Sequence, residues 1–261
     1  MIAKPTAKMG SAVIMSSSLA DHSSRAAVGT HKAPIGGMVD YVEVMVYPVI
    51  TTGINATPHG GLVELFNDKV KWDPFEFYTQ NAKVLTTTGT RLKPMRIDCK
   101  KTLPNDSTIT VYYTAHNAAT DVLSITVHWI YGQSTSVETY AKTGVGTAAA
   151  LTALSWTRDH VTISNIPNGG RAVLALAAFA GTPETIVCEG GAVALRCSAA
   201  DWEPTQFHTE SVSGITTMSG EVQPNGCNLD HPLPSGSDIK ADVKPIDNQS
   251  QKLLLTIVWE G

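Results

Sequence analysis

Charged residues are scarce in this chain: they make up 16% of its 261 residues, and the formal net charge is −4. The first 32 residues contain four basic side chains, those of Lys4, Lys8, Arg25 and Lys32, so the chain has no basic arm of the kind that binds phosphates. No stretch approaches the roughly 18 apolar residues of a membrane-spanning helix, and the hydrophobic content of 43% is that of a globular protein. We therefore expect a globular protein that does not bind nucleic acid directly.

Motifs of catalysis and cofactor binding are also missing from the sequence. It contains no G-x-S-x-G nucleophile elbow, no H-E-x-x-H zinc motif and no glycine-rich phosphate loop. Its four cysteines, Cys99, Cys188, Cys197 and Cys227, form no C-x-x-C pair and are expected to be free, partly buried thiols. We therefore assign no catalytic, cofactor-binding or metal-binding residue, and expect a protein that is not an enzyme and carries no cofactor.

What the chain does contain is an internal repeat. With an offset of 130 residues, residues 60–129 align on residues 190–259 without a gap. The matched positions include Trp72-Asp73-Pro74 with Trp202-Glu203-Pro204, Leu103-Pro104 with Leu233-Pro234, and Trp129 with Trp259. With small shifts the match extends upstream, and it places Gly36-Gly37 on Gly169-Gly170 and Lys8-Met9-Gly10 on Lys142-Thr143-Gly144. Because a repeat of this length determines the architecture, we predict two homologous domains, residues 1–132 and 133–261.

Alternation of apolar and polar residues predicts strands in both copies. The clearest strand ends each copy, with Leu123, Ile125, Val127 and Trp129 on its inner face and equivalent residues at 253, 255, 257 and 259. Further strands are predicted over residues 39–51, 108–114 and 171–180, and residues 147–154 alone have a helical character. Turn signals separate these segments about every 10 to 15 residues. The fold class is therefore predicted as all-β, with two tandem duplicated β-sandwich domains of the jelly-roll kind.

The residues that the two copies share are mostly those of cores and turns. We assign the repeated aromatic side chains to the structural core: Trp72, Phe77, Trp129, Trp202, Phe207 and Trp259. We assign the repeated glycines and prolines to turns or bulges: Gly60, Gly61, Pro104, Gly190, Gly191 and Pro234. The repeat therefore indicates a duplicated scaffold and says little directly about chemistry.

Two repeated pairs allow a ligand-binding interpretation beside the structural one. Asp21-His22 recurs as Asp159-His160, which fits either a metal site or a turn; adjacent strand residues point to opposite faces, so the turn is favoured. Trp72-Asp73 recurs as Trp202-Glu203, which fits either a carbohydrate or calcium contact or a core Trp followed by a turn acid. The second, structural interpretation is the simpler one in both cases.

In its organisation the chain resembles the double jelly-roll major capsid proteins, and the paired single jelly-roll capsid proteins, of membrane-containing icosahedral viruses. The resemblance lies in two tandem β units that cover the chain without an active-site motif. It implies a structural, self-assembling subunit of a virion shell. Three duplicated chains would then form a pseudo-hexagonal capsomer of six β-sandwiches. Its partners would be further copies of itself and other capsid proteins, with room for a membrane beneath the shell.

Two other classes of function remain open from the sequence. The first is a secreted, lectin-like carbohydrate-binding module, which predicts exposed aromatic rings at Trp72 and Trp202. The second is an extracellular filament subunit, in which the N-terminal segment of one chain would complete a sheet of the next.

Overall fold

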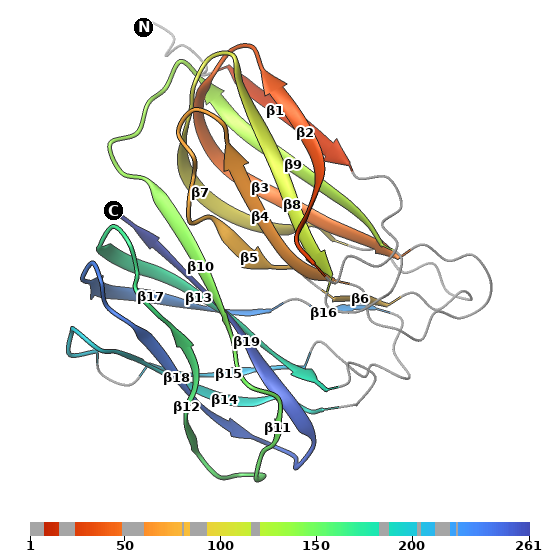
Figure 1. The fold of residues 1–261 in the computed structure, drawn as a ribbon, viewed down its shortest axis with the longest axis vertical. Helices are drawn as coiled ribbons and strands as arrows, with labels where there is room; N and C mark the ends of the chain where they lie inside the picture. The colour runs from red at the N-terminus through yellow and green to blue at the C-terminus, as the bar shows by residue number, and fades with distance from the viewer. Residues whose placement is uncertain are drawn as a thin grey trace, which may run out of the picture.

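A computed structural model describes residues 8–15, 24–48, 60–79, 81–83, 93–115, 121–182, 188–202, 205–211, 220–222 and 224–261. In these residues the chain forms β-strands and no α-helix. Two β-sandwiches lie one above the other along the long axis of the molecule (Figure 1). The prediction of an all-β fold with two sandwiches is confirmed.

The strands of the first sandwich come from residues 9–131 and those of the second from residues 139–260. The first contains β1 (Met9–Met15), β2 (Ala26–Ala33), β3 (Gly37–Pro48), β4 (Gly61–Asn67), β5 (Glu76–Tyr78), β7 (Met95–Leu103), β8 (Ser107–Ala115) and β9 (Asp121–Tyr131). The second contains β10 (Thr139–Val145), β11 (Ala149–Ala150), β12 (Thr157–Ile163), β13 (Gly170–Gly181), β14 (Gly191–Cys197), β15 (Thr205–Thr209), β17 (Asn225–Leu233), β18 (Ile239–Pro245) and β19 (Ser250–Glu260). Two further short strands, β6 (Asn81–Lys83) and β16 (Gly220–Val222), pair with each other.

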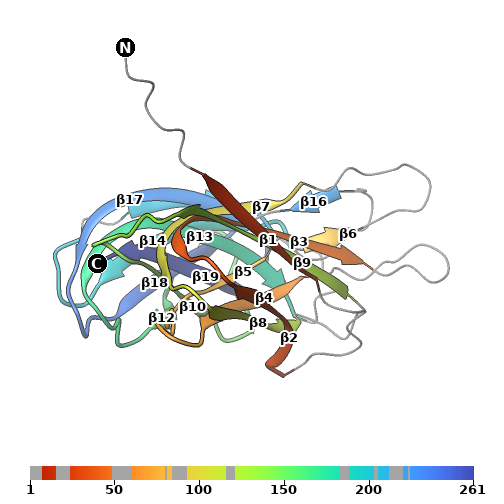
Figure 2. The ribbon, with the colours of Figure 1, turned by 90° about the horizontal axis from the view of Figure 1, so that it is seen from above.

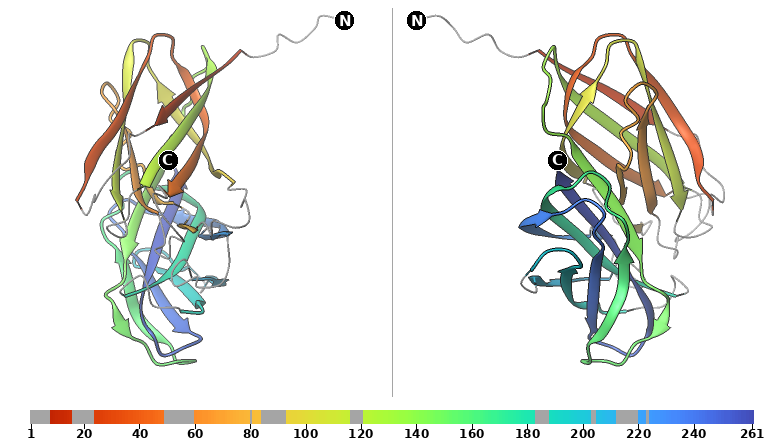
Figure 3. Two further views of the ribbon diagram at one scale, coloured as in Figure 1. Left: turned by 90° about the vertical axis from the view of Figure 1, so that its right-hand side faces the viewer. Right: turned by 60° about the vertical axis from the view of Figure 1, so that its left-hand side comes forward.

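Both sandwiches have the same strand topology. The sheets of the first have the orders β1-β9-β3-β7 and β2-β8-β4-β5, and those of the second β10-β19-β13-β17 and β12-β18-β14-β15. Eight antiparallel strands in two such sheets form a jelly roll, so the chain is a double jelly roll. Figure 3 shows how β10 leads from the first sandwich into the second.

Strand pairing shows which residues of the two copies are equivalent. Gly37 pairs with Leu103 and Gly170 with Leu233, as the predicted match of these glycines requires. At the start of each copy the prediction is wrong, because Gly10 pairs with Trp129 while Tyr140 pairs with Trp259. The equivalent of Gly10 is therefore Tyr140 and not Gly144, so the offset of 130 residues extends to the first strand.

Each sandwich has a core of apolar side chains between its two sheets. On β9 the predicted inner residues, among them Leu123, Ile125 and Trp129, are buried, whereas the alternating residues are half-buried. On β19 the residues of both sides are buried from Leu253 to Trp259. Since a strand buried on both sides needs protein on both sides, the outer face of its sheet must be covered.

Two local predictions are corrected by the structure. Residues 147–154 form no helix: they contain β11 and a turn, in which the Leu154 amide donates to the Pro245 carbonyl at 2.8 Å. Gly61 and Gly191 lie not in turns but at the first positions of β4 and β14. A Cβ at Gly61 would lie 2.2 Å from the Thr114 carbonyl oxygen, so glycine is needed there because a neighbouring strand passes very close.

The remaining turn residues lie between strands. Pro104 precedes the turn between β7 and β8, and Pro234 precedes the equivalent turn between β17 and β18. Their carbonyl groups accept hydrogen bonds from Ser107 Oγ at 2.8 Å and Ser237 Oγ at 2.6 Å. Gly60 and Gly190 precede their strands with positive φ angles of 153° and 87°.

None of the four cysteines, all of which lie in the described part of the chain, takes part in a disulfide bond. Cys188 Sγ and Ser211 Oγ form a hydrogen bond of 2.8 Å. Among the described residues, no helix has the length and apolar character needed to cross a membrane.

The core position of Trp259 generates a first prediction. Its side chain is fully buried, it stacks on Tyr140 with ring centres 5.5 Å apart, and its Nε1 donates to the Asn168 carbonyl at 2.9 Å. Trp259→Ala should lower the free energy of unfolding by about 3 to 5 kcal/mol, measured by urea denaturation. Trp156→Ala, which removes a half-exposed indole, is the matched control and should cost less than about 1 kcal/mol. Equal losses in the two variants would contradict the assignment of Trp259 to the core.

Candidate assembly surface

The two sandwiches pack through an edge of the first and a face of the second. The edge consists of β5 with the residues just before it, and of β7; the face is the outer side of sheet β10-β19-β13-β17. Val258 of this face belongs to the apolar cluster of the first sandwich, and Leu174 and Leu176 pack against the same cluster. We call this contact the joint. It accounts for the burial of β19 on both sides.

Backbone and side-chain hydrogen bonds fix the two sides of the joint to each other. Phe75 and Ala141 form an isolated parallel bridge, in which the Ala141 amide donates to the Pro74 carbonyl at 3.1 Å. Thr143 donates from its amide and from its hydroxyl to Glu76 Oε1, at 2.9 and 2.8 Å. Strand β10 is therefore held along β5 by directed bonds as well as by apolar packing.

A buried ion pair lies at the other side of the joint. The side chain of Lys101 on β7 is 1% exposed, and its Nζ lies 3.6 Å from Glu138 Oε2 and 4.2 Å from the centre of the Tyr140 ring. Glu138 Oε1 also accepts a hydrogen bond of 2.9 Å from the Thr102 amide. Burial lowers the pKa of Lys101 to about 8, although Glu138 acts in the opposite direction. The joint therefore contains a lysine whose charge is only partly compensated.

A second apolar cluster continues the joint along β5. Tyr78 packs with Ala178, Ala180 and Leu254, and the half-buried Leu62 adjoins them. The Tyr78 amide lies 3.3 Å from Thr256 Oγ1, to which it donates a hydrogen bond. Burial raises the pKa of the Tyr78 phenol, so this side chain is neutral at physiological pH.

Strands β6 and β16 connect the sandwiches at one end. They come from equivalent connections, between β5 and β7 in the first sandwich and between β15 and β17 in the second. Their pairing places Lys83 opposite Gly220 and Asn81 opposite Val222. Viewed from above, the two strands lie side by side at the end of the molecule opposite the C-terminus (Figure 2). Both sandwiches therefore present this end to the same side.

The first sandwich carries an uncovered counterpart of the face used in the joint. We call the outer side of sheet β1-β9-β3-β7 the open face. On it Met9, Val13 and Met15 are 56%, 59% and 57% exposed, and Tyr47 is also exposed. Met9 and Val13 are equivalent to Thr139 and Thr143, which the joint engages through hydrogen bonds. Met9 and Val13 thus face solvent where the second sandwich is covered, whereas Met15 faces solvent as its equivalent Val145 does.

The second sandwich carries an uncovered counterpart of the edge used in the joint. We call β15 the open edge. Gln206 and His208 are exposed and Phe207 is half-buried, whereas the equivalent aromatic residues Phe77 and Tyr78 are buried. Each chain therefore contains one joint between its own two sandwiches. It also has an open edge and an open face, which are the two surfaces that a second joint would require.

The six aromatic residues assigned to the core differ in how far they are buried. Trp72, Phe77, Trp129, Trp202 and Trp259 are buried. Phe207 packs against the core cluster of the second sandwich but is only half-buried, because β15 is an uncovered edge strand. Nε1 of Trp72 donates to the Thr102 carbonyl and Nε1 of Trp202 to the Pro232 carbonyl, both at 2.7 Å. These two indoles are therefore not available to stack on a sugar.

The repeated acidic positions do not gather into a metal site where the structure describes them. Asp21, His22 and Glu203 lie outside the described residues. Asp159 is paired with Arg196 and Lys240, and His160 Nε2 accepts a bond of 3.3 Å from the Leu253 amide. No group of three potential metal ligands occurs among the described residues.

Sequence reasoning missed the joint, although one signal for it was present. The outer positions of the last strand carry Ser124, Thr126 and His128 in the first copy but Leu254, Thr256 and Val258 in the second. This difference indicates that the sheet of the second copy is covered. Lys101 and Glu138 gave no such signal, because they become neighbours only when the two sandwiches pack.

Comparisons with known proteins identify the fold and no sequence family. No protein-family model matches the chain, and no curated protein matches it. Among solved structures, PNGase F from Flavobacterium meningosepticum, a glycosylasparaginase, is similar with a TM-score of 0.50 and 10% identity, covering 96% of each chain.

Two viral proteins are similar over the whole length. The STIV MCP, a major capsid protein, has a TM-score of 0.46 and 10% identity and covers 97% of this chain and 96% of its own. The major capsid protein of bacteriophage PM2 has a TM-score of 0.38 and 11% identity, covering 97% of this chain and 98% of its own. At such identities the likeness concerns the fold alone.

The buried Lys101 generates a prediction about pH. Between pH 8 and 10.5 the unfolded chain keeps the proton on Lys101 while the folded chain has lost it, so this residue makes folding more favourable as the pH rises. Lys101→Met removes this contribution. The unfolding free energy of the native protein relative to Lys101→Met should therefore rise across this window, by at most about 3 kcal/mol.

Urea denaturation at a series of pH values measures this difference and cancels the titration of groups common to both proteins. Lys100→Met is the matched control, because the neighbouring Lys100 side chain is 48% exposed. The difference in unfolding free energy between the native protein and Lys100→Met should change little with pH. A pH-independent difference for Lys101→Met would mean that Lys101 is not held in a desolvated position.

Proposed function

We propose that the chain is a structural subunit that assembles with copies of itself into a virion shell, with a trimer as its first assembly. The single observation that carries the proposal is the unfinished second joint. The open edge of one chain is equivalent to the edge that already packs inside the chain, and the open face is equivalent to the face that receives it. The open edge of one chain would therefore dock on the open face of the next.

Side chains on the two open surfaces fit this contact. Val13 offers apolar surface at the position of Thr143, where β10 meets the first sandwich, and Met9 at the position of Thr139. Phe207 and His208 take the places of Phe77 and Tyr78 on the docking strand. Exposed apolar residues that form a row on an edge strand mark contact surfaces, because they would otherwise favour unspecific pairing.

The open face is more polar than the face that is already covered. His128 stacks on Tyr41 with ring centres 4.2 Å apart and lies 3.2 Å from Glu43, while the Arg96 guanidinium lies 3.7 Å from the centre of the Tyr41 ring. A surface that meets its partner only after the chain has folded has to be compatible with water beforehand. Mixed polar and apolar character is therefore expected for a contact between chains.

Head-to-tail contacts of this kind close into a ring when successive rotations add up to a full turn. If each joint turns the next sandwich by about one sixth of a circle, three chains form a closed ring of six sandwiches. Such a pseudo-hexagonal ring can tile a shell, in which other capsid proteins and an underlying membrane would be neighbours.

The competing hypotheses receive less support. The lectin-like module was expected to use Trp72 and Trp202, whose indoles are buried and hydrogen-bonded within the chain. The filament was expected to exchange its N-terminal segment, whereas β1 pairs along its length with β9 of the same chain. We likewise propose that the chain acts without catalysis and without direct contact to nucleic acid, since its open surfaces are suited to bind further copies of the chain.

The proposal predicts the behaviour of two single variants. Val13→Glu places a charge on the open face and His208→Glu places one on the open edge, and each should convert the trimer to a monomer. Size-exclusion chromatography with light scattering measures the mass, and the melting temperature should change little because both side chains are exposed. Ile35→Glu, at an exposed position outside both surfaces, is the control and should remain trimeric.

A mixture of the two variants tests the geometry. Each variant keeps one intact half of the joint, so an equimolar mixture should form a heterodimer through one joint and no ring. Trimers in either single variant, a mixture that stays monomeric, or a wild-type protein that is monomeric at every concentration would contradict the proposal.

A further inference from the structure

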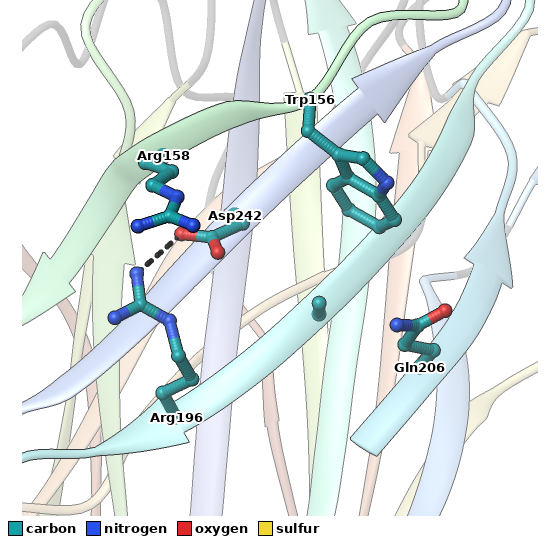
Figure 4. A pocket seen from close by; sticks show the side chains of 6 residues that line it. Trp156, Arg158, Arg196, Gln206 and Asp242 are labelled. Carbon is teal, nitrogen blue, oxygen red and sulfur yellow. Dashed lines mark hydrogen bonds and ion pairs between the residues drawn. The ribbon is translucent and has the colours of Figure 1, made fainter. Parts of the chain in front are cut away.

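The outer face of the second sandwich contains a hollow that the joint does not use. The hollow lies on sheet β12-β18-β14-β15, has a volume of about 330 Å³, and is lined by Trp156, Arg158, Ala194, Arg196, Gln206 and Asp242. This volume is at the lower end of the roughly 300 to 1,000 Å³ of small-molecule sites. The Arg158, Asp242 and Arg196 side chains lie together on one side of the hollow, and Trp156 and Gln206 lie on the other (Figure 4).

Trp156 presents an aromatic surface on a fixed loop. Its side chain is 41% exposed, which is unusual for the largest apolar residue. The loop before it is tied down, because the Ala153 amide donates to Asn248 Oδ1 at 2.6 Å and the Leu154 amide to the Pro245 carbonyl at 2.8 Å. The indole is therefore held at the surface rather than left there by a loose segment.

The polar wall of the hollow is equally well ordered. A bulge between Thr157 and Val161 brings Asp159 to a φ of 50°, and its amide donates to Asp242 Oδ1 at 2.8 Å. Arg196 Nη2 donates to Asp159 at 2.7 Å and to Asp242 at 2.6 Å. These contacts raise the pKa of Arg196 and, together with Lys240, lower the pKa of Asp159. Bulges often turn side chains toward a binding site in this way.

Two donors in the hollow remain unused within the described part of the chain. Nε of Arg196 is buried and has no hydrogen-bond partner there. Arg158 is exposed and belongs to none of the ion pairs found among the described residues. Since Arg196 and Lys240 are balanced by Asp159 and Asp242, the guanidinium of Arg158 leaves the site with one net positive charge. An anionic ligand would find an uncompensated charge here.

In the first sandwich the equivalent position is a smaller hollow of about 160 Å³, narrowed by side chains of its own. Tyr112 and Glu64 replace Asp242 and Ala194, and the Arg25 guanidinium lies 3.5 Å from the centre of the Tyr112 ring while pairing with Glu64. The exposed indole and the unpaired arginine thus belong to the second copy and are not a general property of the fold.

We propose that this hollow binds a single acidic pyranose, a uronic or sialic acid at the end of a glycan. The flat indole would stack on the apolar face of the sugar ring. The Arg158 guanidinium would pair with its carboxylate through two parallel hydrogen bonds. The Asp242 carboxylate would accept hydrogen bonds from its hydroxyl groups. The site thereby selects a ligand with both an apolar ring face and a negative charge.

Binding at the hollow is compatible with assembly. Gln206 alone of the lining residues lies on the open edge, and at the equivalent place beside the joint a hollow of about 160 Å³ that includes Arg25, Glu64 and Glu76 stays open. An acidic sugar could therefore bind to single chains and to assembled ones, and the proposal does not depend on the shell.

The test uses the full chain and three probes: methyl glucuronide, N-acetylneuraminic acid and the neutral methyl glucoside. Binding is followed by calorimetry and by saturation-transfer NMR, which identifies the face of the sugar that contacts protein. At least one of the two acidic sugars should bind at least about 10-fold more tightly than methyl glucoside. The affinities of methyl glucuronide and N-acetylneuraminic acid, compared with each other, distinguish a uronic acid site from a sialic acid site. Equal affinity for the neutral sugar, or no binding of either acid, overturns the proposal.

Variants locate the site. Trp156→Ala and Arg158→Ala should each weaken binding about 10-fold or more, while Trp156→Phe should retain part of it. Leu154→Ala, an exposed residue of the same loop, and Arg25→Ala, on the equivalent face of the first sandwich, are matched controls that should bind normally. Circular dichroism and melting temperature show that each variant is folded. Competition by acetate as strong as by the sugar acids would show a simple anion site and contradict the role of the indole.

Discussion

The strand β19 of the second sandwich is buried on both faces from Leu253 to Trp259, and the arrangement of the molecule depends on the cover of its sheet β10-β19-β13-β17. Its inner side packs on its own partner sheet and its outer side receives the edge of the first sandwich. Apolar burial supplies the attraction, while the bonds of Glu76 to Thr143 and of Glu138 to Thr102 set the alignment. A joint with directed polar contacts holds the two sandwiches in one relative position, which a ring of identical contacts requires.

Duplication has left the two copies with the same topology and different surfaces. The inner positions are kept, as Trp129 and Trp259 or Trp72 and Trp202 show, because a core tolerates little change. The outer positions of the last strand differ between the copies where the second copy meets the first. Ser124 and His128 correspond to Leu254 and Val258, whereas Thr126 corresponds to Thr256 and is unchanged. The outer faces of the sheets β2-β8-β4-β5 and β12-β18-β14-β15 also differ. In the first copy Arg25 pairs with Glu64, whereas in the second the residues around Trp156 leave an open hollow.

The sequence allowed the fold to be predicted because its signals are local or repeated. Alternation on β9 and β19 and the ungapped offset are read directly from the chain, and the jelly-roll topology follows. The joint could not be derived in the same way, since Lys101 and Glu138 are 37 residues apart in different copies and no pattern links them. Phe207 packs on the core as Phe77 does but is less buried, because equivalence predicts the same strand and not the same cover. Trp156 was not predicted to line a binding site, because the sequence analysis relied on residues that recur in both copies and Trp156 does not recur.

The pairing of β6 with β16 has a consequence for any layer built from these chains. It shows that both sandwiches point the same way, with β6 and β16 at one end and the short turns at Pro104 and Pro234 at the other. A layer of such molecules has two chemically distinct sides. Changes in length or composition of the connections at one end would alter one side of the layer and leave the other unchanged, so the two sides can evolve independently.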